Sequence, residues 1–193
     1  MNLLFVDLDD TLLKSDPNLV HIRKKVNDGD WEELSTEDFA KDKMKGKPGV
    51  EYDLSDFFDE EKMYDSIITA TPIIENLKTM DRYVSKGFKV AFLTARATED
   101  AIRRAIKQWL KVRDELGNLK DIGGYFSDDF SAAVNDAKYS KVFGGLKDFE
   151  RKAEVIKKAA SQCERVVFMD DDANNLKSVR GLGLKNVKVI EAK

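Results

Sequence analysis

Residues 3–11 read LLFVDLDDT, in which four apolar residues run directly into a loop rich in aspartate. A short apolar run bounded by polar residues is typical of a strand that is buried on both faces of a sheet. The stretch therefore predicts a buried first strand over residues 3–6. We expect Asp7, Asp9 and Asp10 to follow just beyond the carboxyl end of that strand.

Two later apolar runs end in polar residues in the same way. Residues 88–93 lead into the Thr-Ala-Arg of residues 94–96, and residues 166–169 lead into the three aspartates of residues 170–172. In an open parallel sheet, ligands bind beyond the carboxyl ends of the strands. We therefore expect the three polar loops to form one site.

Segments with helical spacing of apolar residues separate these strands, and they cover residues 73–84, 98–110, 149–160 and 174–179. We expect Thr98 to cap the second helix and residues 187–190 to form a last strand. Strands that alternate with helices predict an α/β fold with a doubly wound parallel sheet. Residues 117–145 are poorly patterned, with short strands expected at residues 125–126 and around Val142.

Residues 15–71 differ in character and are expected to form an insertion after the first polar loop. Asp16 and Pro17 at its start, apolar residues at helical spacing and Gly29 at its end predict a helix. A second helix is expected over residues 35–44, so the insertion should be small, mostly helical and polar.

The insertion divides the chain into two parts. Residues 1–14 and 72–193 are expected to form the core, and residues 15–71 are expected to form a separate small unit. Its aromatic residues Trp31, Phe57 and Phe58 are expected to be buried in the packing of that unit rather than to clamp a ligand.

The composition restricts the chemistry. The chain has 33 Lys and Arg against 36 Asp and Glu, a net charge of -3, which argues against a nucleic-acid binder held by bulk positive charge but allows a local basic groove. Cys163 is the only cysteine and His21 the only histidine, which excludes an intramolecular disulfide and a multi-cysteine zinc site. Both residues are assigned to structure, and acid–base chemistry is expected to fall to carboxylates.

Length and hydropathy indicate a globular chain. Its 193 residues suit one domain, or one core with a modest insertion. No run of about 20 apolar residues is present, and the start carries acid where a secretory signal peptide has basic residues. We expect a cytoplasmic protein with no membrane partner.

An isolated aspartate motif is weak evidence, because chance alone can produce it. About 0.3 accidental matches to Asp-x-Asp-x-Thr/Val are expected in so aspartate-rich a chain, and about 0.01 when four apolar residues must precede the motif. VDLDDTL (6–12), FLTAR (92–96) and VVFMDDDANN (166–175), with a lysine ahead of the last, resemble the four motifs of the haloacid dehalogenase superfamily of aspartyl phosphohydrolases. The resemblance does not cover residues 15–71 or 117–147.

The resemblance implies a Rossmann-like catalytic core and a role for each motif residue. Asp7 falls on the nucleophile and Asp9 on the general acid and base, a role that needs a raised pKa or a transient closure of the site. Thr94 falls on the motif II threonine, and Asp170 and Asp171 fall on the acidic pair. An insertion directly after the first motif is, in this family, a cap that selects the substrate, and residues 15–71 have that position.

Further residues are expected to contact the substrate phosphate. These expected contacts are Thr11, Thr94, Ala95, Arg96, Lys152 and Asn175. Arg96 is equally suited to an ion pair with a loop aspartate. Lys152, at the start of the helix before the last acidic strand, is the lysine expected to neutralise the phosphate; Lys147 is its rival, since the spacing does not decide between them. Asp10 and Asp172 are expected to be loop or cap residues.

A divalent cation follows from the charges. Asp7 and an incoming phosphate are both anions and repel each other. Mg²⁺ relieves this repulsion because it is a hard cation that takes one or two carboxylates together with phosphate oxygens. The expected metal residues are Asp7, Asp9 through its backbone carbonyl, and Asp170 or Asp171.

The resemblance therefore implies a Mg²⁺-dependent phosphomonoester hydrolase that forms an aspartyl phosphate. The LTAR sequence resembles motif II of phosphatases acting on nucleotides or polynucleotide 3′ ends, so the expected partner is a phosphorylated small molecule, a nucleotide or a nucleic-acid 3′-phosphate end, with no obligate protein partner. The alternatives are a small-metabolite phosphatase and a catalytically inactive phosphate-binding domain. A response-regulator receiver fits less well, because its acidic pair lies near the start of the chain.

Overall fold

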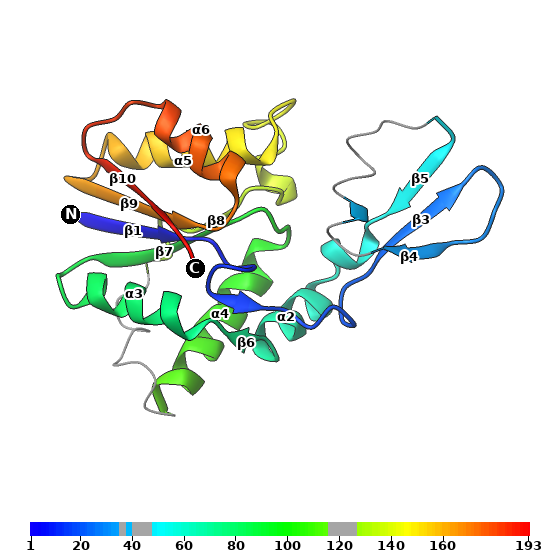
Figure 1. The fold of residues 1–193 in the computed structure, drawn as a ribbon, viewed down its shortest axis with the longest axis horizontal. Helices are drawn as coiled ribbons and strands as arrows, with labels where there is room; N and C mark the ends of the chain where they lie inside the picture. Colours follow the sequence, from blue (N-terminus) through cyan, green and yellow to red (C-terminus); the bar gives the residue numbers. More distant parts are fainter. Residues whose placement is uncertain (35–37, 40–47, 116–126) are drawn as a thin grey trace.

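A five-stranded parallel sheet forms the centre of the molecule, with strand order β10-β9-β1-β7-β8 (Figure 1). The structure is a computed structural model that describes residues 1–34, 38–39, 48–115 and 127–193. The strands are β1 (Asn2–Val6), β7 (Lys89–Thr94), β8 (Ala132–Ala133), β9 (Arg165–Asp170) and β10 (Val187–Glu191). All neighbouring pairs in this sheet run parallel, which confirms the predicted α/β class and is compatible with a Rossmann-like fold.

Helices cover both faces of the sheet (Figure 1). On one face lie α3 (Ile74–Val84) and α4 (Glu99–Glu115), and on the other lie α5 (Asp148–Ala160) and α6 (Ala173–Gly181). Side chains of β1 alternate between the faces: Leu4 and Val6 join the core beneath α3 and α4, whereas Leu3 and Phe5 join the core beneath α5 and α6. Among the described residues, no helix combines the length and the apolar character needed to cross a membrane.

Two local predictions in the core are wrong. Thr98 does not cap α4: its φ is 56°, and its hydroxyl donates to the Ala97 carbonyl. The Glu99 amide at the start of α4 instead donates to Asp136 at 2.7 Å. Val142 lies in an exposed turn rather than a strand, and the expected strand at residues 125–126 falls outside the described residues.

The insertion contains an antiparallel sheet with strand order β4-β3-β5. Its strands are β3 (Ile22–Val26), β4 (Glu32–Leu34) and β5 (Val50–Asp53), and they are followed by the 3-10 helix η1 (Ser55–Phe58) and by α2 (Glu60–Ile68). The predicted helix between Asp16 and Gly29 is therefore wrong. Of the helix predicted over residues 35–44, only residues 38–39, which are helical, are described.

Charge pairing between strands explains this difference. Ile22 and Val26 are four residues apart, a spacing that puts two side chains on one face of a strand as well as on one face of a helix. The basic strand β3 lies between two acidic strands, so that Arg23 faces Glu33 on one side and Asp53 on the other. Opposite charges across strands stabilise a sheet, and these partners are distant in the sequence. Gly29 closes a turn by donating to the Val26 carbonyl.

The aromatic residues of the insertion are less buried than predicted. Trp31 is 48% exposed and Phe58 is 61% exposed, and Phe57 is half-buried. The prediction that Trp31 and Phe58 are buried in the packing of the insertion is therefore wrong.

The helix α2 packs as part of the core, although it lies within the predicted insertion. Met63 and Ile67 are buried, and Ile67 shares its hydrophobic cluster with Ile102 and Trp109 of α4. The Trp109 indole also donates to the Ala70 carbonyl at 3.0 Å. The helix α2 therefore packs against α4 although it precedes the predicted boundary at residue 71.

The buried carboxylate of Glu99 ties α4 to the segment after β8. Glu99 is 0% exposed and accepts hydrogen bonds from Arg103, Lys138, Tyr139 and the Ala133 amide. Burial alone would raise the pKa of Glu99, but the hydrogen bonds from Lys138 and Arg103 outweigh burial and hold the pKa below its ordinary value. The ionised carboxylate therefore stabilises the fold.

We expect Glu99→Gln to lower the free energy of unfolding by about 3 kcal/mol, because it removes one partner from a buried charged network. Since folding lowers the pKa of Glu99, its contribution is complete at neutral pH and is lost as the pH falls below about 4. Urea unfolding at pH 7 and pH 3 measures both effects. Glu154→Gln, an exposed change on α5, should cost little, and an equal loss at both pH values for Glu99→Gln would contradict the ionised role.

Candidate functional site

Three aspartates meet at the carboxyl ends of β1 and β9. Val6 pairs with Met169 at the ends of these strands, so that Asp7 and Asp170 follow side by side, and the Asp7 amide donates to the Met169 carbonyl at 3.0 Å. Carboxylate oxygens of Asp7, Asp170 and Asp171 all lie within 4.8 Å of one another. The parallel pairing of the two strands thus brings together residues that are distant in the sequence.

A buried lysine lies between two of these carboxylates. Lys152 of α5 is 1% exposed, and its Nζ is 2.9 Å from Asp7 Oδ1 and 2.9 Å from Asp170 Oδ2. Burial alone would lower the pKa of Lys152, but the two carboxylates outweigh burial and raise it, so the ammonium stays charged. The rival Lys147 is exposed and lies over the Phe149 ring, so the structure places Lys152, not Lys147, among the carboxylates.

The negative charge of the cluster exceeds what one lysine neutralises. Burial raises the pKa of Asp7 to about 7, and the neighbouring Asp170 carboxylate adds to the rise while Lys152 opposes it. A second positive charge would favour the ionised form of Asp7. Carboxylate oxygens are the ligands that hard divalent cations such as Mg²⁺ take, so Asp7, Asp170 and Asp171 fit such a cation.

Two predicted phosphate contacts instead hold the acidic pair. Asn175 donates its side-chain amide to both oxygens of Asp170 at 3.0 Å, and the Thr11 hydroxyl donates to Asp171 Oδ1 at 2.9 Å. Both side chains are buried and fix the orientation of the carboxylates. In this conformation both side chains are therefore bound to the acidic pair and are not open to a phosphate.

The outer aspartates are loop and cap residues, as predicted. Asp172 caps α6 by accepting from the amides of Asn174 and Asn175 at 2.8 and 2.9 Å. Asp10 is exposed and adopts a left-handed φ of 54°, which an aspartate tolerates better than most residues.

Asp9 lies outside the carboxylate cluster and pairs with Arg96. The Arg96 Nε and Nη2 atoms donate to the two oxygens of Asp9 at 2.7 and 2.6 Å, which confirms the alternative of an ion pair with a loop aspartate. Burial alone would raise the pKa of Asp9, but Arg96 outweighs it and lowers the pKa. The raised pKa expected for an acid is therefore not found in this conformation.

The loop after β7 is fixed by hydrogen bonds, some of them from residues that the sequence analysis missed. Thr94 is 1% exposed, and its hydroxyl accepts from the Arg96 amide at 3.2 Å. The Ala95 carbonyl accepts from the side chain of Asn135, which in turn accepts from Arg151. Asn135 lies in the poorly patterned segment, so no periodicity marked it.

Two serines and an asparagine were also missed. Ser15 donates to Asp9 Oδ1 at 3.1 Å, and Ser66 accepts from Arg96 at 2.7 Å. Asn76 donates to the Thr11 carbonyl at 2.8 Å. One signal was available for Ser66, because it is a polar residue between Met63 and Ile67 on the apolar side of α2.

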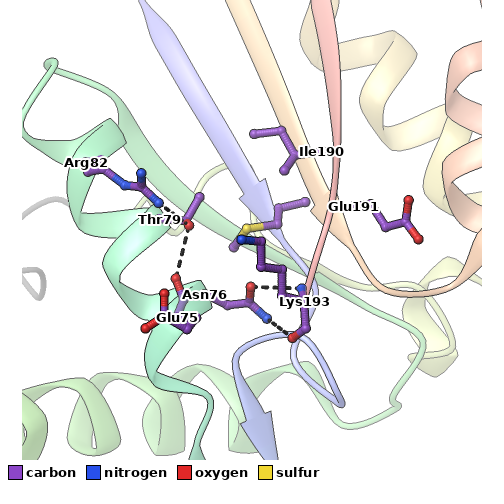
Figure 2. A pocket seen from close by; sticks show the side chains of 8 residues that line it. Glu75, Asn76, Thr79, Arg82, Ile190, Glu191 and Lys193 are labelled. Atoms are coloured by element: carbon purple, nitrogen blue, oxygen red, sulfur yellow. Dashed lines mark hydrogen bonds between the residues drawn. The ribbon is translucent and has the colours of Figure 1, made fainter.

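Two hollows lie apart from the carboxylates. One is a cavity of about 210 Å³ between α3 and β10. Figure 2 shows the side chains that line it, where Asn76 and Lys193 exchange hydrogen bonds and Arg82 donates to Thr79. A second hollow, of about 410 Å³, is lined by the basic residues Lys86, Arg165, Lys185 and Lys188. Neither is lined by a member of the aspartate cluster, so the candidate site is defined by its chemistry.

Comparison with known proteins assigns no family to the chain. Protein-family models, curated proteins and solved structures give no match. The functional argument therefore depends on the geometry of the site and on the motifs.

We expect Mg²⁺ to raise the melting temperature, because a ligand that binds only the folded state stabilises it by about 2.7 kcal/mol at 100 times its Kd. Asp171→Asn should remove most of this shift, since it deletes one carboxylate of the cluster. Thermal unfolding over a series of Mg²⁺ concentrations measures the effect. Asp129→Asn, at an exposed aspartate outside the cluster, should keep the full shift, and an equal shift in both variants would place the cation elsewhere.

Proposed function

We propose that this chain is a Mg²⁺-dependent phosphomonoester hydrolase of the haloacid dehalogenase type. The observation that carries the proposal is the meeting of Asp7, Asp170 and Asp171, with the Lys152 ammonium between the first two. A carboxylate nucleophile can divide a difficult phosphate hydrolysis into two easier steps. The surrounding charges are those that such a nucleophile needs in order to approach an anionic phosphate.

In the first step, an oxygen of Asp7 attacks phosphorus and forms an aspartyl phosphate. The bond between phosphorus and the ester oxygen breaks, and the leaving oxygen departs with the electron pair. Lys152 stabilises the charge on the phosphoryl oxygens, and Thr94 donates its hydroxyl to one of them. Asp7, Asp170 and Asp171 would hold a Mg²⁺, which when bound would supply charge neutralisation.

In the second step, water attacks the same phosphorus while Asp9 takes a proton from it. The bond between phosphorus and the Asp7 oxygen breaks, which returns the Asp7 carboxylate and releases phosphate. Arg96 lowers the pKa of Asp9, which keeps the carboxylate ionised and able to accept that proton but also makes it a weaker base. Service as an acid in the first step, which the sugar hydroxyl of a nucleotide would require, needs the ion pair between Asp9 and Arg96 to open. Esters of acidic alcohols such as p-nitrophenol leave without a proton and do not need this opening.

We further propose that the insertion acts as a cap over this site and that the substrate is a nucleotide or a nucleic-acid 3′-phosphate end. Trp31 and Phe58 are exposed aromatic residues on the insertion, and an exposed ring gives a base a face on which to stack. A small-metabolite phosphatase would not need such rings. Trp31→Ala should therefore weaken the binding of nucleotide substrates more than the binding of aryl phosphates.

We expect the protein to hydrolyse p-nitrophenyl phosphate with Mg²⁺ and Asp7→Asn to lower turnover by about 10³-fold or more, because the nucleophile is lost. EDTA should abolish turnover, and added Mg²⁺ should restore it. Release of p-nitrophenol measures both, with Asp129→Asn as the matched control.

Wild-type turnover in Asp7→Asn would refute the nucleophile assignment. Phosphate binding without turnover of any ester would identify the alternative, an inactive phosphate-binding domain. A panel of phosphorylated metabolites, nucleotides and 3′- and 5′-phosphorylated oligonucleotides then defines the substrate class.

A further inference from the structure

The guanidinium of Arg96 joins three segments that are distant in the sequence. It is bound by Asp9 after β1, by Ser15 at the start of the insertion, and by Ser66 on α2 at its end. Arg96 is 8% exposed and Ser66 is 0% exposed. The second aspartate of the first motif is therefore linked, through one buried side chain, to both ends of the insertion.

Each nitrogen of the guanidinium has its own partner. Nε and Nη2 bind the two Asp9 oxygens, and Nη2 also donates to Ser15 Oγ at 2.5 Å. Nη1 donates to Ser66 Oγ at 2.7 Å, and its other described neighbour is the Met63 sulfur at 4.0 Å. Because a thioether is a weak acceptor, Ser66 is the main partner of Nη1.

Ser66 is itself held in one orientation. Its hydroxyl donates to the Met63 carbonyl at 2.9 Å, which points a lone pair of the oxygen toward Arg96. The adjacent Ile67 is buried in the core shared with α4, so α2 is a fixed support. A guanidinium is planar and rigid, so holding Nη1 at one end sets the plane in which Nε and Nη2 hold the Asp9 carboxylate.

We infer that Ser66 is a positioning residue that, through Arg96, orients the Asp9 carboxylate to take a proton from the attacking water. This role rests on the proposed function, since it concerns the second step at the same site. Ser66 is fully buried and is not a member of the aspartate cluster. Its effect should therefore appear only in the step that uses Asp9.

A double-mutant cycle tests the physical link without any assay of activity. Ser66→Ala should lower the melting temperature by about 3 °C in the wild-type background, because a buried donor loses its partner. In the Asp9→Asn background the shift should be clearly smaller, because Arg96 no longer has an anion to align. Thr69→Ala removes an exposed hydroxyl from the same region, one that donates to the Asp65 backbone carbonyl, and its shift should be equal in both backgrounds.

Steady-state kinetics with p-nitrophenyl phosphate test the role. The p-nitrophenolate leaves without a proton, so the first step does not need Asp9. We expect Ser66→Ala to lower kcat and KM together by about 10-fold, with kcat/KM unchanged and a burst of p-nitrophenol, because the aspartyl phosphate accumulates. A merely structural role would lower kcat by reducing the active fraction and would leave KM unchanged.

The outcomes separate the two proposals. Shifts in melting temperature that add in the cycle, or a fall in kcat at constant KM, overturn the positioning role while the phosphatase stands. A wild-type protein that hydrolyses no phosphate ester overturns the proposed function and the kinetic role with it, even if the cycle shows coupling. Coupled shifts together with parallel falls in kcat and KM support both.

Discussion

The ammonium of Lys152 between Asp7 and Asp170 is the contact on which the site depends. It links α5 to the ends of β1 and β9 at 2.9 Å on each side, and its side chain is almost fully buried. Two carboxylates so close together and so deeply buried would repel each other without a cation. The same charge that holds the carboxyl ends of these strands together is the one that the proposed function uses on a phosphate, so structure and proposed chemistry share one residue.

Much of the core could be predicted because its signals are local. The apolar runs that form β1, β7 and β9 are each continuous in the sequence, and strand order then brings Asp7 and Asp170 to one edge. The orientation of side chains depends on contacts with residues that are distant in the sequence. Thr11 and Asn175 turn toward the carboxylates rather than toward open space, and sequence spacing does not determine that choice.

The insertion shows a different limit of sequence reasoning. The spacing of Ile22 and Val26 suits a helix and a strand equally. Pairing with acidic residues on two other strands favours the strand. The exposure of Trp31 and Phe58 likewise depends on how few residues of the small insertion surround their rings. Predictions based on apolar periodicity are weakest where a small unit is stabilised by charge pairing instead of by an apolar core.

The antiparallel ribbon of β2 (Leu13–Lys14) and β6 (Thr71–Pro72) makes the chain leave the large sheet and return to it at one point. Since the two ends are already held together, lengthening the outer strands or turns adds only a slowly growing entropic cost. Evolution can therefore enlarge, shorten or replace the outer sheet without changing the register of β1. With such a scaffold, the residues of the candidate site can stay the same while the outer sheet, which we propose selects the substrate, changes.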